Sequence, residues 1–145
     1  MTTPHDYFGS MELDERQRSY RAVLDFPPHH KVSVTIDWMG VAPAEALTQS
    51  QEICERVRAR EQEYQSKIAR DLLHLYNDNW RDGEMLDADG FMRRISLSDI
   101  GISAADFGSA GCVSVYYSDG DLFAGHSIEV ILDGDLNYVK SHIAG

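Results

Sequence analysis

Residues 43–79 constrain the fold more than any other part of the sequence, because after Pro43 they contain no glycine and no proline. Residues three or four positions apart along this stretch form one mainly apolar stripe: Leu47, Ser50, Cys54, Val57, Glu61, Tyr64, Ile68, Leu72 and Leu75. This spacing predicts one long amphipathic helix that covers a sheet. We expect the helix to begin at Pro43, because the missing N–H of a proline costs nothing at the first helical position.

The length of this helix is unusual for so small a protein. An unbroken helix over residues 43–79 would be roughly 55 Å long, which exceeds the width of a domain of this size. We therefore expect either an overhang or a bend, and the polar residues 58–63 are the expected place for a bend. A coiled-coil dimer is the alternative use of such length, although Ser50 and Glu61 on the stripe disfavour it.

Alternating apolar and polar residues predict strands on both sides of the helix. Before it, the predicted strands are residues 19–26 and 31–38, which flank Pro27-Pro28-His29-His30, and a weaker strand at 7–13. After it, one or two helical turns at residues 91–95 precede four predicted strands: 97–102, 112–117, 127–132 and 138–143. The last connections contain Asp119-Gly120 and Asp133-Gly134, dipeptides that favour turns between strands.

These elements predict an α+β fold: an antiparallel sheet of about six or seven strands with one long amphipathic helix packed on a face. Because strands precede and follow the helix, we expect one domain over residues 1–145. Its parts are N-terminal strands in residues 7–38, the helix in 43–79, and C-terminal strands and hairpins in 95–143. A chain of this length can bury a core without disulfides.

The charge is strongly negative and unevenly distributed, with 24 acidic and 13 basic residues and a net charge of −11. Residues 1–42 contain six acidic and four basic side chains (net −2), residues 43–81 contain seven and six (net −1), and residues 82–145 contain eleven and three (net −8). Such a field repels nucleic acids and anionic membranes and attracts a basic protein partner. Solubility alone is the competing explanation.

The sequence also predicts a location. The N-terminus lacks a basic region followed by an apolar stretch, and no run of eighteen apolar residues occurs, so we expect a cytoplasmic protein. Two cysteines far apart in sequence, Cys54 and Cys112, fit reduced thiols there.

The motifs of common catalytic and metal sites are missing. No HExxH, CxxC, GxSxG or glycine-rich phosphate loop occurs, and the adjacent His29 and His30 would rarely converge on one metal. Residues 78–89 resemble a calcium loop, but Trp80 stands at the third position and Asp89 at the twelfth. Cys54 and Cys112 are more typical of core residues than of nucleophiles. We expect no metal and no cofactor.

One polar cluster near the C-terminus has two interpretations. Asp119, Asp121, His126 and Glu129 follow the strand at 112–117, and a carboxylate of this loop could accept a hydrogen bond from the imidazole. That arrangement fits a general base, with Asp119 or Asp121 orienting His126. It fits equally a hydrogen-bonded clamp on an irregular loop that contains Gly120 and Gly125. The clamp is the favoured interpretation.

Exposed tyrosines and carboxylates indicate a binding surface. Tyr116 and Tyr117 are neighbours in a strand and must point to opposite faces, so we expect one hydroxyl at the surface. Tyrosine together with carboxylates suits a cationic protein partner. The residues predicted to bind such a partner are Tyr116, Tyr117, Asp119, Asp121, His126, Glu129, Asp133 and Asp135.

The C-terminal part resembles bacterial domains of unknown function. The resemblance rests on the segment FMRRISL at residues 91–97, the segment VYYSDGDLFAGHSIEV at 115–130, and the final Ile-Ala-Gly. Such domains typically end in D-x-x-L-F-x-G-H-x-I-x-V and a terminal glycine. Ala124 here replaces an aromatic residue, often tryptophan, of that pattern. The resemblance covers roughly the last 55 residues and implies no activity.

Small acidic bacterial domains without catalytic motifs also resemble immunity proteins, which cover the active site of a partner toxin. Many such toxins are basic, so this analogy agrees with the charge. We therefore expect a non-enzymatic protein, monomeric or homodimeric, that binds a basic toxin. A small enzyme that uses His126 and a dimerisation module built on the helix are the alternatives.

Overall fold

The computed structural model describes residues 1–29 and 31–145, so His30 lies outside the described residues. The elements follow the chain in this order: β1 (Thr2–His5), β2 (Gly9–Asp14), β3 (Ser19–Asp25), β4 (Lys31–Asp37), α1 (Pro43–Leu75), the π-helical turn η1 (Tyr76–Trp80), α2 (Ala88–Arg94), β5 (Ser96–Ser103), the 3-10 turn η2 (Ala104–Asp106), β6 (Val113–Ser118), β7 (Ser127–Leu132) and β8 (Tyr138–Ala144). The fold is α+β, which confirms the prediction.

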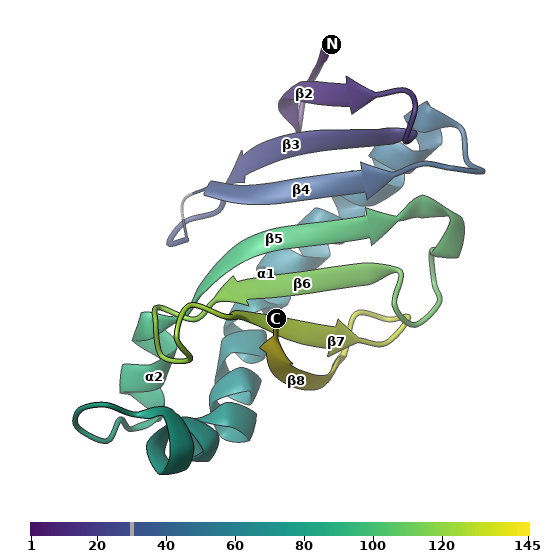
Figure 1. Cartoon of the computed structure of the whole chain (residues 1–145). Coiled ribbons are helices and arrows are strands. Elements are labelled where there is room, and N and C mark those ends of the chain that lie inside the picture. Colours follow the sequence, from purple (N-terminus) through teal and green to yellow (C-terminus); the bar gives the residue numbers. More distant parts are fainter. Residues whose placement is uncertain (30) are drawn as a thin grey trace.

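The strands form one eight-stranded sheet in chain order, from β1 at one edge to β8 at the other (Figure 1). Neighbouring strands are antiparallel except β4 and β5, which are parallel. This pair is joined through the helices, because parallel strands need a long crossover rather than a tight turn. The predicted antiparallel sheet therefore holds apart from this one pair.

The strand count is slightly higher than the predicted six or seven. The weak strand predicted at 7–13 corresponds to β2, which begins at Gly9. The further strand is β1, whose sequence TTPH has no alternating apolar pattern. It pairs with β2, with Thr2 opposite Glu12.

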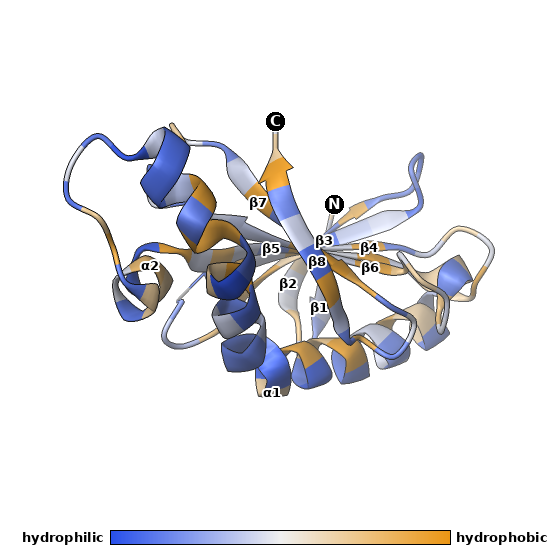
Figure 2. Ribbon diagram, turned by 90° about the horizontal axis from the view of Figure 1, so that it is seen from below, coloured by the Kyte–Doolittle hydropathy of each residue, from blue (hydrophilic) through white to orange (hydrophobic). Residues whose placement is uncertain are grey.

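The helix α1 covers one face of the sheet. It begins at Pro43, as predicted, and the N–H of Ala46 donates the first helical hydrogen bond to the carbonyl of Ala42 at 3.0 Å. Figure 2 shows that α1 bends in its middle instead of projecting straight past the sheet. Its C-terminal half lies along β8, where the Tyr138 hydroxyl donates to Asp71 Oδ2 at 2.7 Å. The apolar stripe of α1 is covered by the sheet and is not free to form a coiled-coil seam.

A polar cluster lies in this covered layer; we call Tyr117, Glu61 and His29 the buried cluster. Glu61 Oε1 accepts a hydrogen bond from the Tyr117 hydroxyl at 2.7 Å and lies 2.8 Å from His29 Nε2. The N–H of Leu97 donates to His29 Nδ1 at 3.2 Å, so the proton of a neutral imidazole is on Nε2 and is donated to Glu61. These bonds explain a charged residue on a mainly apolar stripe, because Glu61 joins α1 to the sheet.

The other face of the sheet is open. Figure 1 views the sheet from this side, with α1 behind it. Tyr116, Glu129 and His142 lie opposite one another on neighbouring strands and form the open-face cluster. The Tyr116 hydroxyl donates to Glu129 Oε2 at 3.0 Å, and His142 Nε2 lies 2.8 Å from Glu129 Oε1. The same three residue types thus occur on both faces.

Candidate functional site

The residues predicted to contact a partner are divided among four places: the covered layer and loop interior (Tyr117, Asp119), the open face (Tyr116, Glu129), the surface of loop 119–126 (Asp121, His126) and the β7–β8 turn (Asp133, Asp135). Tyr117 is fully buried and Asp119 is 3% exposed, so neither contacts a partner in this structure. The predicted role of Tyr117 and Asp119 in binding a partner therefore does not fit their burial.

The two tyrosines differ in environment as the strand alternation predicts. Burial, and then the nearby Glu61 carboxylate, raises the pKa of Tyr117 well above its ordinary value. The hydrogen bond to Glu129 is the main cause that raises the pKa of Tyr116. Only Tyr116 presents part of its ring at the surface.

In the β7–β8 turn, the Asp133 carboxylate binds backbone N–H groups of the turn itself. Asp133 Oδ1 accepts hydrogen bonds from the N–H groups of Asp135 and Asn137, both at 2.9 Å. These bonds, chiefly the one from the Asn137 N–H, lower the pKa of Asp133. The Asp135 carbonyl accepts from Arg56 at 3.0 Å and from Arg60 at 3.3 Å. Both residues therefore organise the turn and its contact with α1.

The loop of residues 119–126 is a hydrogen-bonded clamp whose centre is Asp119. Its Oδ1 accepts from the N–H of Asp121 at 2.9 Å, and its Oδ2 accepts from the N–H groups of Phe123 and Gly125 at 2.9 and 3.0 Å. A carboxylate that accepts three backbone N–H groups fixes the path of the loop. The loop is therefore a hydrogen-bonded clamp, as favoured from the sequence, and Asp119 makes the bonds that hold it.

The carboxylate partner predicted for His126 is wrong. The Nδ1 atom of His126 lies 2.6 Å from the carbonyl oxygen of Phe123, which fixes the proton on Nδ1. Asp119 directs both of its carboxylate oxygens to the backbone instead. Around the described residues, none of the four main cavities has His126 in its wall.

The clamp places Phe123 between the end of α1 and α2. Phe123 is fully buried, and its ring contacts those of Tyr76, Trp80 and Phe91 at centroid distances of 6.0, 5.6 and 6.2 Å. Gly120 has a φ of 57°, and a Cβ there would lie 2.1 Å from the carbonyl oxygen of Arg94. Only glycine permits this approach, which docks the loop on α2.

Trp80 is a candidate functional residue that the sequence did not indicate, since it stood out only as a mismatch in the calcium-loop pattern. It ends the π-helical turn η1, a rare structure often found at functional sites. Trp80 is 39% exposed, yet its ring contacts the rings of Phe123 and His126 at centroid distances of 5.6 and 5.9 Å. The ring is therefore both accessible and fixed.

The segment that contains Trp80 is strongly acidic. Residues 78–89 contain five acidic side chains (Asp78, Asp82, Glu84, Asp87 and Asp89) and one basic side chain, Arg81, for a net charge of −4. Within the part of the chain that the structure describes, none of these carboxylates forms an ion pair. Arg81 instead donates to the carbonyls of Asn77 and Gly83, at 2.9 and 2.8 Å.

The segment that carries these charges is held in place by Asn77. Its Nδ2 donates to the Leu86 carbonyl at 2.9 Å, and its Oδ1 accepts from the Leu86 N–H at 3.0 Å. We call residues 78–89, together with Asp121 and His126, the acidic corner. Figure 1 shows the end of α1, α2 and the loop after β6 gathered at this corner of the molecule.

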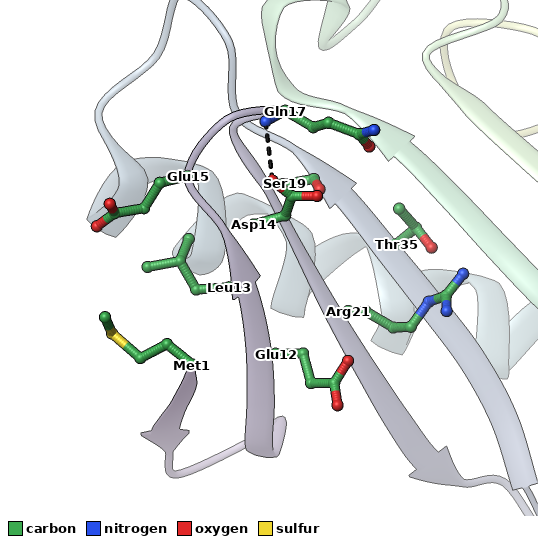
Figure 3. Close-up of a pocket in the computed structure, with 9 residues that line it drawn as sticks. All are labelled: Met1, Glu12, Leu13, Asp14, Glu15, Gln17, Ser19, Arg21 and Thr35. Carbon is green, nitrogen blue, oxygen red and sulfur yellow. Dashed lines mark hydrogen bonds between the residues drawn. The ribbon is translucent and has the colours of Figure 1, made fainter.

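The largest of the main cavities, about 580 Å³, lies elsewhere, along the β2–β3 hairpin on the open face (Figure 3). It is lined by Met1, Glu12, Leu13, Asp14, Glu15, Gln17, Ser19, Arg21 and Thr35. Glu12 and Arg21 lie opposite each other on their strands, so acidic and basic groups share its wall. No aromatic ring lines it, and it is a weaker candidate than the acidic corner.

The described residues provide no cluster for a metal ion, and Cys54 is not a reactive thiol. No group of three or more His, Cys, Asp or Glu side chains there is arranged to hold a metal ion. Burial raises the pKa of Cys54 to about 12, so its thiol stays protonated and unreactive. Within residues 1–29 and 31–145, no helix has the length and apolarity needed to cross a bilayer.

The fold and the corner define a small α+β protein with an exposed aromatic residue on an acidic surface. The chain belongs to the DUF2262 family, described as an uncharacterized protein conserved in bacteria, which matches residues 5–143. No curated protein matches the chain, and no solved structure matches it.

Proposed function

We propose that this bacterial protein is a cytoplasmic, non-enzymatic binding protein, an immunity protein that neutralises a cognate basic toxin through the acidic corner. The observation that carries the proposal is Trp80, an exposed indole packed on Phe123 in an acidic segment whose carboxylates form no ion pair within the described residues.

Physical principles support this use of the corner. Unpaired carboxylates attract a basic partner over distance and raise the rate of association. Tryptophan is among the residues most enriched at the energetic centres of interfaces, because it buries a large area at low conformational cost. The contacts of Trp80 with Phe123 and His126 already restrict its rotamers, so little entropy remains to be lost on binding.

A catalytic role for His126 receives less support. A general base needs a substrate site beside it, and His126 lies against Trp80 with Nδ1 committed to a backbone carbonyl. Its contacts support a different task, which is to hold the indole of Trp80 in place.

The test is capture of the partner from the native bacterium with the whole protein as bait. The test variant is Asp82→Asn/Glu84→Gln in the acidic corner. The matched control is Glu45→Gln/Glu52→Gln, which removes the same charge from the exposed side of the N-terminal half of α1. Glu52 precedes Trp80 by 28 residues, roughly 40 Å along a helix.

We expect the wild type and the control to retain a basic protein that the corner variant loses. Co-expression should then show that the wild type, and not the corner variant, protects cells from that protein. Equal retention by the corner variant, or capture of only acidic proteins, would contradict the proposal.

A further inference from the structure

We propose that Trp80 receives an arginine side chain of the partner, with the guanidinium over the indole and the carboxylates of the acidic corner around it. This inference rests on the proposed function for its biological setting. The chemistry itself, recognition of a guanidinium cation, is set by the corner and can be tested without the partner.

Two contacts between an arginine guanidinium and an aromatic ring already occur within the protein. The guanidinium of Arg58 lies 4.1 Å from the ring centroid of Phe26, and that of Arg70 lies 5.7 Å from the ring centroid of Tyr138. Both cations belong to α1 and both are arginines. Among the described residues, no cation covers Trp80 in the same way, although tryptophan is the best of the three rings for such contacts.

Two arginines of this corner bind backbone carbonyls. Arg81 donates to two backbone carbonyls of its own segment. Arg94 donates to the Gly120 carbonyl at 2.8 Å and so joins α2 to loop 119–126. Arg81 and Arg94 thus build the corner through backbone carbonyls rather than through ion pairs with Asp78, Asp82 or Glu84. An arginine from outside would offset part of the remaining negative charge.

Arginine fits this corner better than lysine. Its planar guanidinium stacks on an aromatic ring and is more weakly hydrated than an ammonium group. The same guanidinium can also donate paired hydrogen bonds to a carboxylate at the edge of the ring. An apolar side chain would cover Trp80 but would leave the carboxylates without a partner.

The first experiment uses the Trp38→Phe variant, in which Trp80 is the only indole. Within the described part of the chain, the Nε1 atom of Trp38 has no hydrogen-bond partner, so phenylalanine removes no such bond. Tri-arginine amide is titrated at low salt while the indole emission is followed. Tri-lysine amide and tri-citrulline amide are the controls, since citrulline has the shape of arginine without its charge.

We expect a saturable change in Trp80 emission with tri-arginine, a weaker affinity for tri-lysine, and no saturable change with tri-citrulline. Calorimetry on the Trp80→Leu variant should then give about twofold to fivefold weaker binding of tri-arginine, as expected for an exposed cation–π contact. Trp80→Tyr retains an aromatic ring against Phe123, so its affinity for tri-arginine should lie between those of the wild type and Trp80→Leu. It replaces Trp80→Leu as the test if leucine disturbs the fold.

Equal affinities for tri-arginine and tri-lysine, or unchanged binding by both Trp80 variants, would overturn the inference. If these results occurred while partner capture still depended on Asp82 and Glu84, the arginine contact alone would fail. If tri-arginine bound as expected but no basic partner were captured, the proposed function alone would fail.

Discussion

The carboxylates inside this protein differ from those at its acidic corner in whether other groups of the fold donate hydrogen bonds to them. Asp119 accepts three backbone N–H groups, and Glu61 accepts from Tyr117 and His29. Asp82 and Glu84, in contrast, are exposed and form no ion pair with the described residues. The first pair holds the fold together, and the second carries the charge that the proposed partner would bind.

The buried cluster and the open-face cluster differ in a similar way, although both consist of a tyrosine, a glutamate and a histidine. Tyr116 and Tyr117 are adjacent, and each donates to a glutamate that also contacts a histidine. One cluster is enclosed between α1 and the sheet, and the other lies on the open face. Burial decides which of the two contributes to stability, because an unpaired polar group costs free energy only where water cannot reach it.

The largest expected effect is on Asp119. Asp119→Asn keeps the size of the side chain but replaces a charged acceptor with an amide, so we expect the free energy of unfolding to fall by about 2–3 kcal/mol. Asp121→Asn is the matched control in the same loop; its side chain is exposed and asparagine tolerates its φ of 65°, so the expected change is within about 0.5 kcal/mol. Urea unfolding measures both. Equal losses would contradict the assignment of the clamp to Asp119.

The next largest difference is expected between substitutions of Glu61 and Glu129. Glu61→Gln should lower the free energy of unfolding by about 2 kcal/mol, because two buried donors lose their charged acceptor. Glu129→Gln on the open face should change it by at most about 0.5 kcal/mol, since solvent replaces the lost contacts. Chemical unfolding monitored by circular dichroism distinguishes the two. A larger loss for Glu129→Gln would reverse the roles given to the two clusters.

The pH dependence should separate the two tyrosines. A tyrosine whose pKa is raised by folding contributes stability that is complete below about pH 10 and is lost as the pH rises further. Tyr117 has the larger rise of the two. Between about pH 8 and pH 11, the wild type should therefore lose up to about 1 kcal/mol more stability than Tyr117→Phe does. Tyr116→Phe should reduce this loss less, and a greater effect of Tyr116→Phe would be incompatible with the burial of Tyr117.

The smallest expected effect on stability belongs to the acidic corner. Asp82→Asn/Glu84→Gln removes like charges that repel one another, so the free energy of unfolding should stay within about 0.5 kcal/mol of the wild type. Thermal unfolding at low and high salt checks this, with Glu45→Gln/Glu52→Gln as the control. A loss comparable with that of Asp119→Asn would mean that these carboxylates are part of the fold.

The sequence predicts the local features of this protein and fails on the distant ones. Local features depend only on neighbouring residues in the sequence. The start of the helix at Pro43 and turns at Asp119-Gly120 and Asp133-Gly134 are such features, and the structure has them where they were expected. The partners of Glu61 are 32 residues before it and 56 after it, so the stripe could reveal only that a polar residue stood among apolar ones.

Register limits the prediction of the open-face cluster. A two-residue turn at Asp133-Gly134 would place Glu129 opposite Tyr138, but the observed turn spans residues 133–137 and places it opposite His142. Trp80 gave no periodic signal, because its exposure depends on a π-helical turn and on packing against Phe123. Such features arise from tertiary contacts that no local pattern contains.

Hydrogen–deuterium exchange of the complex with the captured protein shows which surface the partner covers. If the partner covers the acidic corner, binding slows exchange in residues 77–87 and 119–126 and leaves the β2–β3 hairpin and the turn at 133–137 unchanged. Slower exchange along the open-face strands, with none at residues 77–87, would contradict the proposal.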